Sequence, residues 1–210
     1  MHEDAGKIAE YLLKIKAVRL NPREPFTWSS GWRSPIYCDN RMALSFPEIR
    51  NAIRDAFAQK IRQAYPQAAG IVGVATGAIA WGALVADVLN LPFAYVRASA
   101  KGHGLQNLIE GRVESGLPYI IIEDLISTGK SSAQAVEAVK ETGAGVLATL
   151  AIFSYGFPQA EATFAATGTN YESLTNLSAL LEKATQIAYL QGAEQETIFT
   201  WQQQPEMWGR

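Results

Sequence analysis

A series of short apolar segments, beginning at Gly70 and separated by longer helical or turn-rich stretches, limits the fold of this chain more than any other feature. This alternation is typical of βαβ units, in which helices connect parallel strands. The segments are apolar almost throughout, which indicates strands covered on both faces. The sequence therefore predicts an α/β fold with a central, mostly parallel sheet flanked by helices. The predicted strands are Gly70–Val74, Phe93–Val96, Tyr119–Ile122 and Val146–Phe153, and the predicted helices between them are Ile79–Leu89 and Ser131–Thr142, the latter ending at Gly143.

Further helices are expected toward both ends of the chain. Apolar residues recur at helical spacing over Glu3–Val18, which predicts a helix there. Ser45 and Glu48 form a capping-box pattern, so a second helix is expected to begin at Ser45. A last helix is expected over residues 178–191, where Ser178 provides the cap, and the polar tail behind it contains Trp201.

The size and charge of the chain exclude several classes of protein. Its 210 residues, 48% of them hydrophobic, are enough for one well-buried core and predict a single domain. A net charge of -2 and a pI near 5.8 indicate neither nucleic acid nor an anionic membrane as a partner. A single cysteine, Cys38, forms no internal disulfide, and nothing resembles a secretion signal or a membrane-spanning segment. The sequence therefore predicts a cytoplasmic protein whose phosphate affinity, if any, is local.

The stretch YIIIEDLISTGKSS, residues 119–132, carries the strongest chemical signal. An apolar strand runs directly into Glu123 and Asp124, and a loop of small residues follows. One interpretation is a solvated turn with a helix N-cap. The loop favours an anion site instead, because backbone N–H groups at the start of a helix bind phosphate. A nucleotide P-loop is excluded, since that motif needs glycine where Asp124 stands.

This segment resembles the phosphoribosyl diphosphate signature of the type I phosphoribosyltransferases, which combines an apolar strand, two acids and a Thr/Ser-Gly loop. The resemblance implies that fold, and it implies that Glu123 and Asp124 hold the ribose 2- and 3-hydroxyls. Glutamate takes the place of the commoner aspartate at the first position. Asp124 is thereby a candidate catalytic residue. The residues that the resemblance assigns to the 5-phosphate are Leu125, Ile126, Ser127, Thr128, Gly129, Lys130 and Ser131.

A segment without sustained periodicity, residues 98–118, is expected to form a long loop. Structureless loops of more than about 12 residues are uncommon and often act as lids. The string YVRASAKGHG at its start resembles the catalytic loop of the orotate phosphoribosyltransferases. By that resemblance Arg97, Lys101 and His103 contact the departing diphosphate, and Lys101 is catalytic. For Lys101 or His103 alone, a solvated surface residue is the alternative.

Two departures from the family weaken the leaving-group side. Ala98 stands where many members have a second lysine, and Gly77 stands where some members have one in the diphosphate-binding turn, ATGAI. Backbone amides of residues 76–78 remain able to bind oxygen. The losses make Lys101 more important.

The segment FTWSSGWRSPIYCDNR, residues 26–41, resembles the base-binding segment of the same subfamily and favours orotate over purines. Tyr37 is a candidate for stacking on the base, with a role in the core as the alternative. By the resemblance, Ser127 meets the base through its hydroxyl. The partner of the orotate carboxylate stays open, and Arg41 is one candidate.

The resemblance implies an enzyme that transfers phosphoribosyl from phosphoribosyl diphosphate to orotate, with Mg²⁺ held by substrate and water rather than directly by the protein. It also implies a homodimer in which each long loop closes over the neighbouring site. Within the single domain, residues 1–45 are expected to form an N-terminal helix and base-binding hood, 46–157 the core and 158–210 a C-terminal strand and helices. The alternatives are a transferase for another base and a non-catalytic regulator that senses phosphoribosyl diphosphate.

Overall fold

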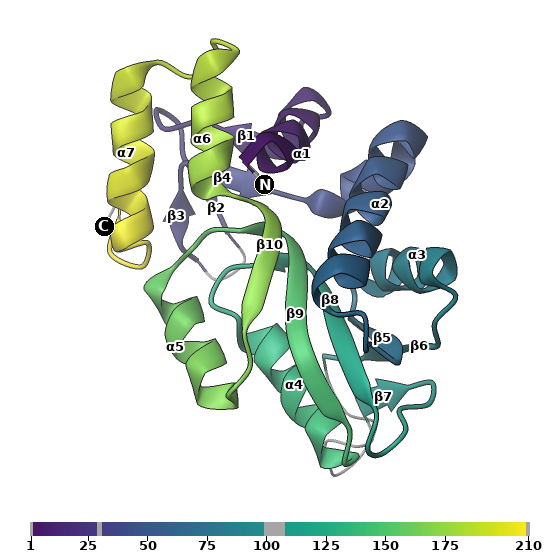
Figure 1. Ribbon diagram of the computed structural model, residues 1–210. Coiled ribbons are helices and arrows are strands. Elements are labelled where there is room, and N and C mark those ends of the chain that lie inside the picture. The colour runs from purple at the N-terminus through teal and green to yellow at the C-terminus, as the bar shows by residue number, and fades with distance from the viewer. Residues whose placement is uncertain (1, 29–30, 99–107, 209–210) are drawn as a thin grey trace.

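The computed structural model describes residues 2–28, 31–98 and 108–208 and confirms the α/β fold (Figure 1). The strands are β1 (Val18–Leu20), β2 (Phe26–Thr27), β3 (Arg33–Ser34), β4 (Ile36–Cys38), β5 (Gly70–Val74), β6 (Phe93–Val96), β7 (Ile109–Glu110), β8 (Pro118–Ile126), β9 (Gly145–Ser154) and β10 (Tyr171–Asn176). The helices are α1 (His2–Lys14), the 3-10 helix η1 (Asn40–Ser45), α2 (Pro47–Ala64), α3 (Ile79–Leu89), α4 (Lys130–Glu141), α5 (Pro158–Thr167), α6 (Leu177–Gln186) and α7 (Gly192–Gln203).

The central sheet has six strands in the order β10-β9-β8-β5-β6-β7. Neighbouring strands are parallel except at one edge, where β7 runs antiparallel to β6. Helices cover both faces. Ile120 and Ile122 belong to the core cluster that includes α2 and α3, whereas Ile121 belongs to the cluster that includes α4. Both side-chain phases of β8 are therefore buried, which explains why this strand is apolar throughout.

The two central strands, β5 and β8, are followed by helices on opposite faces of the sheet. α3 leads from β5 to β6, and α4 leads from β8 to β9, which lies on the other side of the pair. The carboxyl ends of β5 and β8 therefore form a topological switch point. In open α/β sheets, ligands bind in the crevice at such a point.

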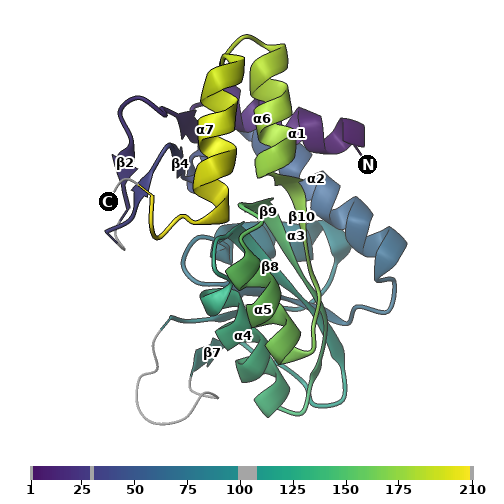
Figure 2. The same ribbon diagram turned by 90° about the vertical axis from the view of Figure 1, so that its left-hand side faces the viewer.

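The two ends of the chain come together beyond this sheet. Figure 2 shows α1, α6 and α7 beside the small strands β1–β4, above the sheet in that view. α1 packs against α6 and β10, and α7 packs against α6. β1 pairs with β4, and β2 pairs with β3, both antiparallel. No helix among the described residues has both the length and the apolar character that a bilayer crossing requires.

The N-terminal helix is shorter than predicted. α1 ends at Lys14 and does not reach Val18. Lys16 has a φ of 59°, a left-handed conformation that cannot continue a helix, and Val18 instead starts β1 opposite Cys38. The apolar spacing that predicted a longer helix belongs partly to this strand.

The predicted cap of the second helix is wrong as well. Ser45 is the last residue of η1, and Phe46 is the N-cap of α2 without any side-chain hydrogen bond. Pro47 occupies the first helical position, where its fixed φ suits the helix and its missing N–H is not needed. Proline therefore marks this helix start, and the Ser-x-x-Glu pattern is coincidental.

Three further expectations need correction near the edge strand and the C-terminus. The segment after Arg97 is not wholly a loop, because Ile109–Glu110 forms β7 against β6. The cap of α6 is Asn176 rather than Ser178, and its side chain accepts the Ala179 N–H at 2.9 Å. α6 ends well before residue 191, and Trp201 lies on α7 with no exposed surface rather than in a polar tail.

Candidate functional site

The acid pair lies near the end of β8, at the switch point. The side chain of Glu123 is buried and accepts two hydrogen bonds, from the Asp124 N–H at 3.0 Å and from the Ser132 hydroxyl at 2.9 Å. Burial raises the pKa of Glu123 well above its ordinary value, and the charge of Asp124 raises it further. Ser132 lies in the first turn of α4, so this acid also ties the strand to the helix that follows.

The side chain of Asp124 lies near the carboxyl end of β8, against the turn that follows β5. Burial raises the pKa of Asp124, while a hydrogen bond with Glu123 and the charge of Arg41 lower it. Arg41 is thus a source of positive charge that favours the ionised form of Asp124, whereas the main influences on the pKa of Glu123, burial and the charge of Asp124, include no cation. The Asp124 carboxylate lies against Gly77 in the turn after β5: a Cβ built on Gly77 would stand 2.2 Å from Oδ2 of Asp124. The Asp124 carboxylate and the turn after β5 are therefore in direct contact.

The loop after the acids is shorter than the assigned segment. Leu125 and Ile126 continue β8 opposite Phe153 and Ser154 of β9, so the loop itself is Ser127 to Gly129 and α4 begins at Lys130. Gly129 is the N-cap with a φ of 78°, a conformation that favours glycine, and no side chain caps the helix. The first N–H groups of α4 therefore lack a side-chain acceptor, which suits an anion. The side chains of Lys130 and Ser131 are exposed.

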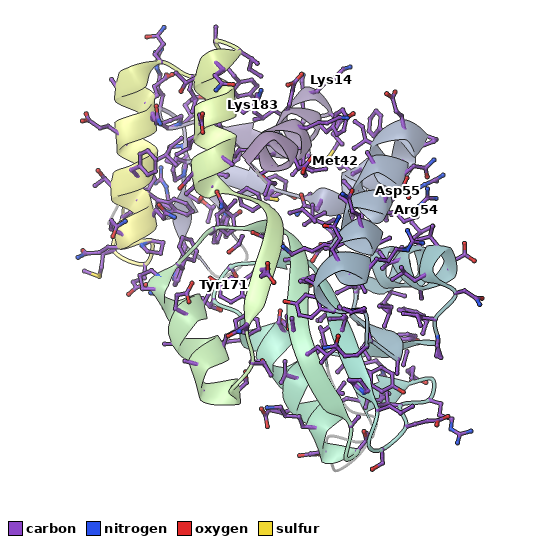
Figure 3. All side chains as sticks on the ribbon, in the orientation of Figure 1. Lys14, Met42, Arg54, Asp55, Tyr171 and Lys183 are labelled. Carbon is purple, nitrogen blue, oxygen red and sulfur yellow. The ribbon has the colours of Figure 1, made fainter. Side chains whose placement is uncertain are left out.

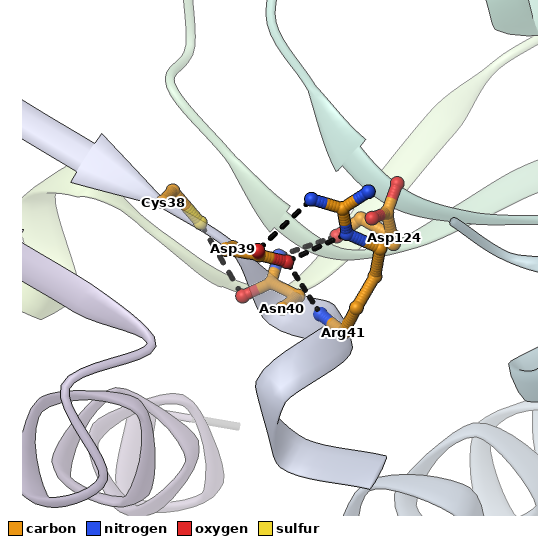
Figure 4. Close-up of polar contacts among 5 residues, drawn as sticks. All are labelled: Cys38, Asp39, Asn40, Arg41 and Asp124. Carbon is orange, nitrogen blue, oxygen red and sulfur yellow. Dashed lines mark hydrogen bonds and ion pairs between the residues drawn. The ribbon is translucent and has the colours of Figure 1, made fainter. Parts of the chain in front are cut away.

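The end of the segment assigned from the sequence to the base, at the start of η1, joins β4 to the acids (Figure 4). Asn40, at the start of η1, is fully buried, and its Nδ2 donates to the backbone carbonyl of Asp124 at 2.7 Å. Its Oδ1 accepts the thiol of Cys38 at 3.3 Å. Burial raises the pKa of the Cys38 thiol well above its ordinary value, which keeps it protonated as a donor. Asn40 therefore fixes β4 relative to the end of β8.

The leaving-group residues are only partly placed. Arg97 follows β6, the strand next to β5, and its Nη1 lies 3.3 Å from Oε1 of Glu110 on β7. Ala98 is exposed beside it. Lys101 and His103, assigned from the sequence to the diphosphate, lie outside the described residues.

On the base side, Tyr37 of β4 is half-buried and in contact with other side chains. Its ring centroid lies 5.8 Å from that of Phe26, and the Arg19 guanidinium lies 4.8 Å from it. Both alternatives for Tyr37 therefore stay open, since one face of the ring is engaged within the protein.

An aromatic cluster that sequence reasoning missed supports this side. Trp28 packs on Tyr155, Phe157 and Trp201, with centroids 5.1, 6.5 and 5.7 Å away. Gln202 donates to the backbone carbonyl of Tyr155 at 2.5 Å. The cluster joins the β2–β3 hairpin, the loop after β9 and α7. A high density of aromatic residues in two short stretches was the available signal, but the pattern does not show that distant segments meet.

Comparisons with known proteins agree with this geometry. Residues 43–161 match the model of the phosphoribosyl transferase domain. The orotate phosphoribosyltransferase of Cytophaga hutchinsonii is 49% identical over 202 residues, which are 96% of this chain and 97% of the relative. That of Bacteroides thetaiotaomicron is 48% identical over 200 residues, 95% of this chain and 94% of the relative. The crystal structure of the orotate phosphoribosyltransferase from Aeropyrum pernix superimposes with a TM-score of 0.75 at 31% identity, covering 85% of this chain and 98% of that one.

Proposed function

The chain belongs to the orotate phosphoribosyltransferases, and from this premise we propose how its crevice transfers the phosphoribosyl group of phosphoribosyl diphosphate to orotate. The reaction gives orotidine 5′-phosphate and diphosphate, a step of pyrimidine synthesis. One observation carries the assignment of the site: the acid pair of β8 meets the turn after β5 at the topological switch point. Ribose binds at the acids, and the groups on either side of it bind phosphate and diphosphate.

The acids have different roles. Glu123 is buried and holds a proton to higher pH, so it accepts or donates a hydrogen bond at a ribose hydroxyl while Ser132 keeps it in place. Asp124 carries the charge that faces the ribose carbon as positive charge develops there. Electrostatic stabilisation of a transition state needs such a preorganised group. Asp124 is thereby the catalytic carboxylate of the chain.

The 5-phosphate binds at the loop and at the start of α4. The uncapped N–H groups of the first turn, together with the hydroxyls of Ser127, Thr128 and Ser131, offer donors to a terminal phosphate. Gly129 allows the backbone to turn into the helix, and Lys130 adds charge nearby. Leu125 and Ile126 contribute as the strand that places this loop. Ser127 also meets the base.

The diphosphate leaves on the side of β6. Arg97, Lys101 and His103 supply the contacts that stabilise it, with Lys101 acting on the transition state. Mg²⁺ accompanies the substrate, because oxygen ligands and retained water suit this ion and Asp124 presents carboxylate oxygens beside the diphosphate turn. The ion supplies charge neutralisation for the leaving group. Removing Mg²⁺ with excess chelator should abolish turnover, and adding Mg²⁺ back should restore it. Full turnover in the presence of the chelator would contradict the proposal.

The long loop acts across a homodimer, and each chain folds as one domain with hood, core and C-terminal parts at residues 1–45, 46–157 and 158–210. Mixing a Lys101→Ala chain with an Asp124→Asn chain tests the shared site. A heterodimer then has one site with both residues intact and should regain activity. Mixed dimers as inactive as both parents would show that each site uses its own loop.

A direct assay tests the function itself. Orotate consumption with phosphoribosyl diphosphate and Mg²⁺ is measured beside adenine, guanine and uracil under the same conditions. Orotate should be the preferred base. Turnover of another base at a higher kcat/KM would indicate the rival transferase, and binding of phosphoribosyl diphosphate without turnover of any base would indicate the regulator.

A further inference from the structure

Arg41, one candidate from the sequence for the partner of the orotate carboxylate, is a cation whose charge acts on Asp124. Its guanidinium is held by Asp39 through two hydrogen bonds, from Nε to Oδ1 at 2.7 Å and from Nη2 to Oδ2 at 2.9 Å. The Arg41 backbone N–H also donates to the same carboxylate at 3.2 Å. More than half of the Arg41 side chain is exposed, at 58%. A guanidinium has five N–H donors, so a ligand still finds donors on a group whose direction is already set.

The structure places this guanidinium beside the acids rather than on a remote surface. Asn40 donates to the backbone carbonyl of Asp124, so the residue that follows Asn40 starts within reach of the Asp124 carboxylate. In the view of Figure 4 the Arg41 side chain rises from η1 on the side where the Asp124 side chain lies. The charge of Arg41 lowers the pKa of Asp124, and that of Asp124 raises the pKa of Arg41. The two groups therefore lie close enough for their charges to interact.

The turn after β5 has no charge of its own to offer a polyanion. Its sequence, ATGAI at residues 75–79, contains no ionisable side chain. Gly77 cannot gain one while Asp124 stays in place, because the Asp124 carboxylate fills the position of a Cβ there, with Cγ at 2.4 Å and both oxygens at 2.2 and 2.6 Å. A diphosphate bound at this turn needs a cation from another element. Arg41 is the described cation whose charge lowers the pKa of Asp124, the residue packed against the turn.

We propose that Arg41, clamped by Asp39, binds the diphosphate group of phosphoribosyl diphosphate and so supplies from η1 the charge that the turn after β5 lacks. This inference rests on the proposed placement of the diphosphate at that turn. Asp39 orients Arg41, and Asn40 sets the distance of both from the acids. The same guanidinium neutralises part of the Asp124 charge, which lets a polyanion approach an acidic site.

The geometry favours the diphosphate over the orotate carboxylate as the ligand. Asp124 is in contact with the turn at Gly77, and the charge of Arg41 acts on Asp124. The Tyr37 ring has the Arg19 guanidinium over it, at 4.8 Å from its centroid. Tyr37 also raises the pKa of Arg41, but less than Asp39 and Asp124 do. A kinetic comparison separates the two ligands, because diphosphate and the base enter the reaction as different substrates.

The test uses the reaction in both directions with Arg41→Ala and Arg41→Gln. We expect the KM values for phosphoribosyl diphosphate and, in the reverse reaction, for inorganic diphosphate to rise roughly tenfold or more, as expected for a lost charged hydrogen bond. The KM values for orotate and orotidine 5′-phosphate should stay within about twofold, since those ligands keep their contacts. Arg41→Lys should fall between, because lysine retains the charge without the paired bonds to Asp39.

Arg54→Ala is the matched control. Arg54 is also an arginine paired with a neighbouring aspartate, with Nε 2.8 Å from Oδ1 of Asp55, and Figure 3 shows both on the outer side of α2. Its KM values should equal those of the wild type. Thermal melts with added inorganic diphosphate and Mg²⁺ give a second readout without turnover: the wild type should gain melting temperature and Arg41→Ala should lose that gain.

Three outcomes would overturn the assignment. They are a rise confined to the KM of orotate or orotidine 5′-phosphate, an equal rise for all substrates, and values no different from Arg54→Ala. If Arg41→Ala melts before assay, Arg41→Gln, which keeps the length and polarity of the side chain, decides in its place. Wild-type turnover of orotate judges the proposed function separately, because it does not depend on any Arg41 variant.

Discussion

Replacing Gly77 by alanine should damage the site with little change to the fold. Gly77 does not have a positive φ, so alanine is compatible with its backbone. The added methyl group would stand 2.2 Å from Oδ2 of Asp124, whereas ordinary contact begins at 3.4 Å. Asp124 must therefore retreat by about 1 Å, and displacements of that size in a catalytic group cost on the order of 10²-fold in rate.

The expected stability change is small, because two effects oppose each other. Overpacking a buried position costs about 1–3 kcal/mol. Alanine also restricts the unfolded chain more than glycine does, which returns about 0.4–1 kcal/mol. The Asp124 carboxylate ends a short side chain and moves more readily than backbone, so we expect the low end of this range. The variant should melt close to the wild type while kcat/KM falls by about two orders of magnitude.

The assay is steady-state kinetics with orotate, with Gly6→Ala in α1 as the control. A Cβ at Gly6 meets nothing closer than Cε of Lys183 at 3.5 Å, so this variant should keep full activity and gain about 0.5–1 kcal/mol. A double-mutant cycle with Asp124→Asn locates the effect: if Gly77→Ala acts through Asp124, its loss should shrink in that background. A Gly77→Ala enzyme within about threefold of the wild type, far short of the expected loss, would refute the reasoning.

Further predictions concern the other parts of the site and its support. Burial raises the pKa of Glu123, so the folded protein retains a proton that the unfolded chain releases, and stability falls as pH rises from the unfolded toward the folded pKa. The melting temperature of Glu123→Gln should therefore exceed that of the wild type by more at about pH 8 than at about pH 5. A difference that is the same at both pH values would contradict this. Trp201→Ala should lower the free energy of unfolding, measured in urea, by about 3–5 kcal/mol, because removing a fully buried indole leaves a cavity. A loss below about 1 kcal/mol would show that the surrounding aromatic cluster collapses to fill the cavity. Lys101→Ala should lose a factor of about 10²–10³ in turnover with a smaller change in KM. Lys130→Ala should lose less, because its backbone amide remains. An active Lys101→Ala enzyme would favour the alternative interpretation of Lys101 as a solvated surface residue.

The central sheet was the most predictable part of the fold. The bounds of β5, β6 and α3 agree with the predicted ranges residue for residue. Strands buried on both faces are apolar at every position, so their ends coincide with the change to polar or turn residues. The same signal underestimated β8, since Glu123 and Asp124 continue the strand although they are acids. The polarity of these two acids led the sequence pattern to predict a strand that ends before them.

The chain ends were less predictable because pairing partners decide their structure. Val18 continues a helical spacing in the sequence, but β4 is available to pair with it, and a strand forms. Trp201 has polar neighbours in the sequence, but in the fold it packs against Trp28 and Tyr155 from distant segments, and this packing helps to bury it. Long-range contacts of this kind override local preference.

Gly77 shows why the site itself was only partly readable. From the sequence it appears as a loss, a position where some relatives have a lysine and this chain has nothing. In the structure the Asp124 carboxylate occupies the space of any side chain at that position, so a residue with a Cβ and this arrangement of the acid exclude each other. The charge of Arg41, in a 3-10 helix more than thirty residues earlier in the chain, acts on Asp124, and it is the charge that we propose for the diphosphate. The absent side chain at position 77 therefore follows from where the Asp124 carboxylate lies, and the role proposed for Arg41 follows from the lack of charge in that turn.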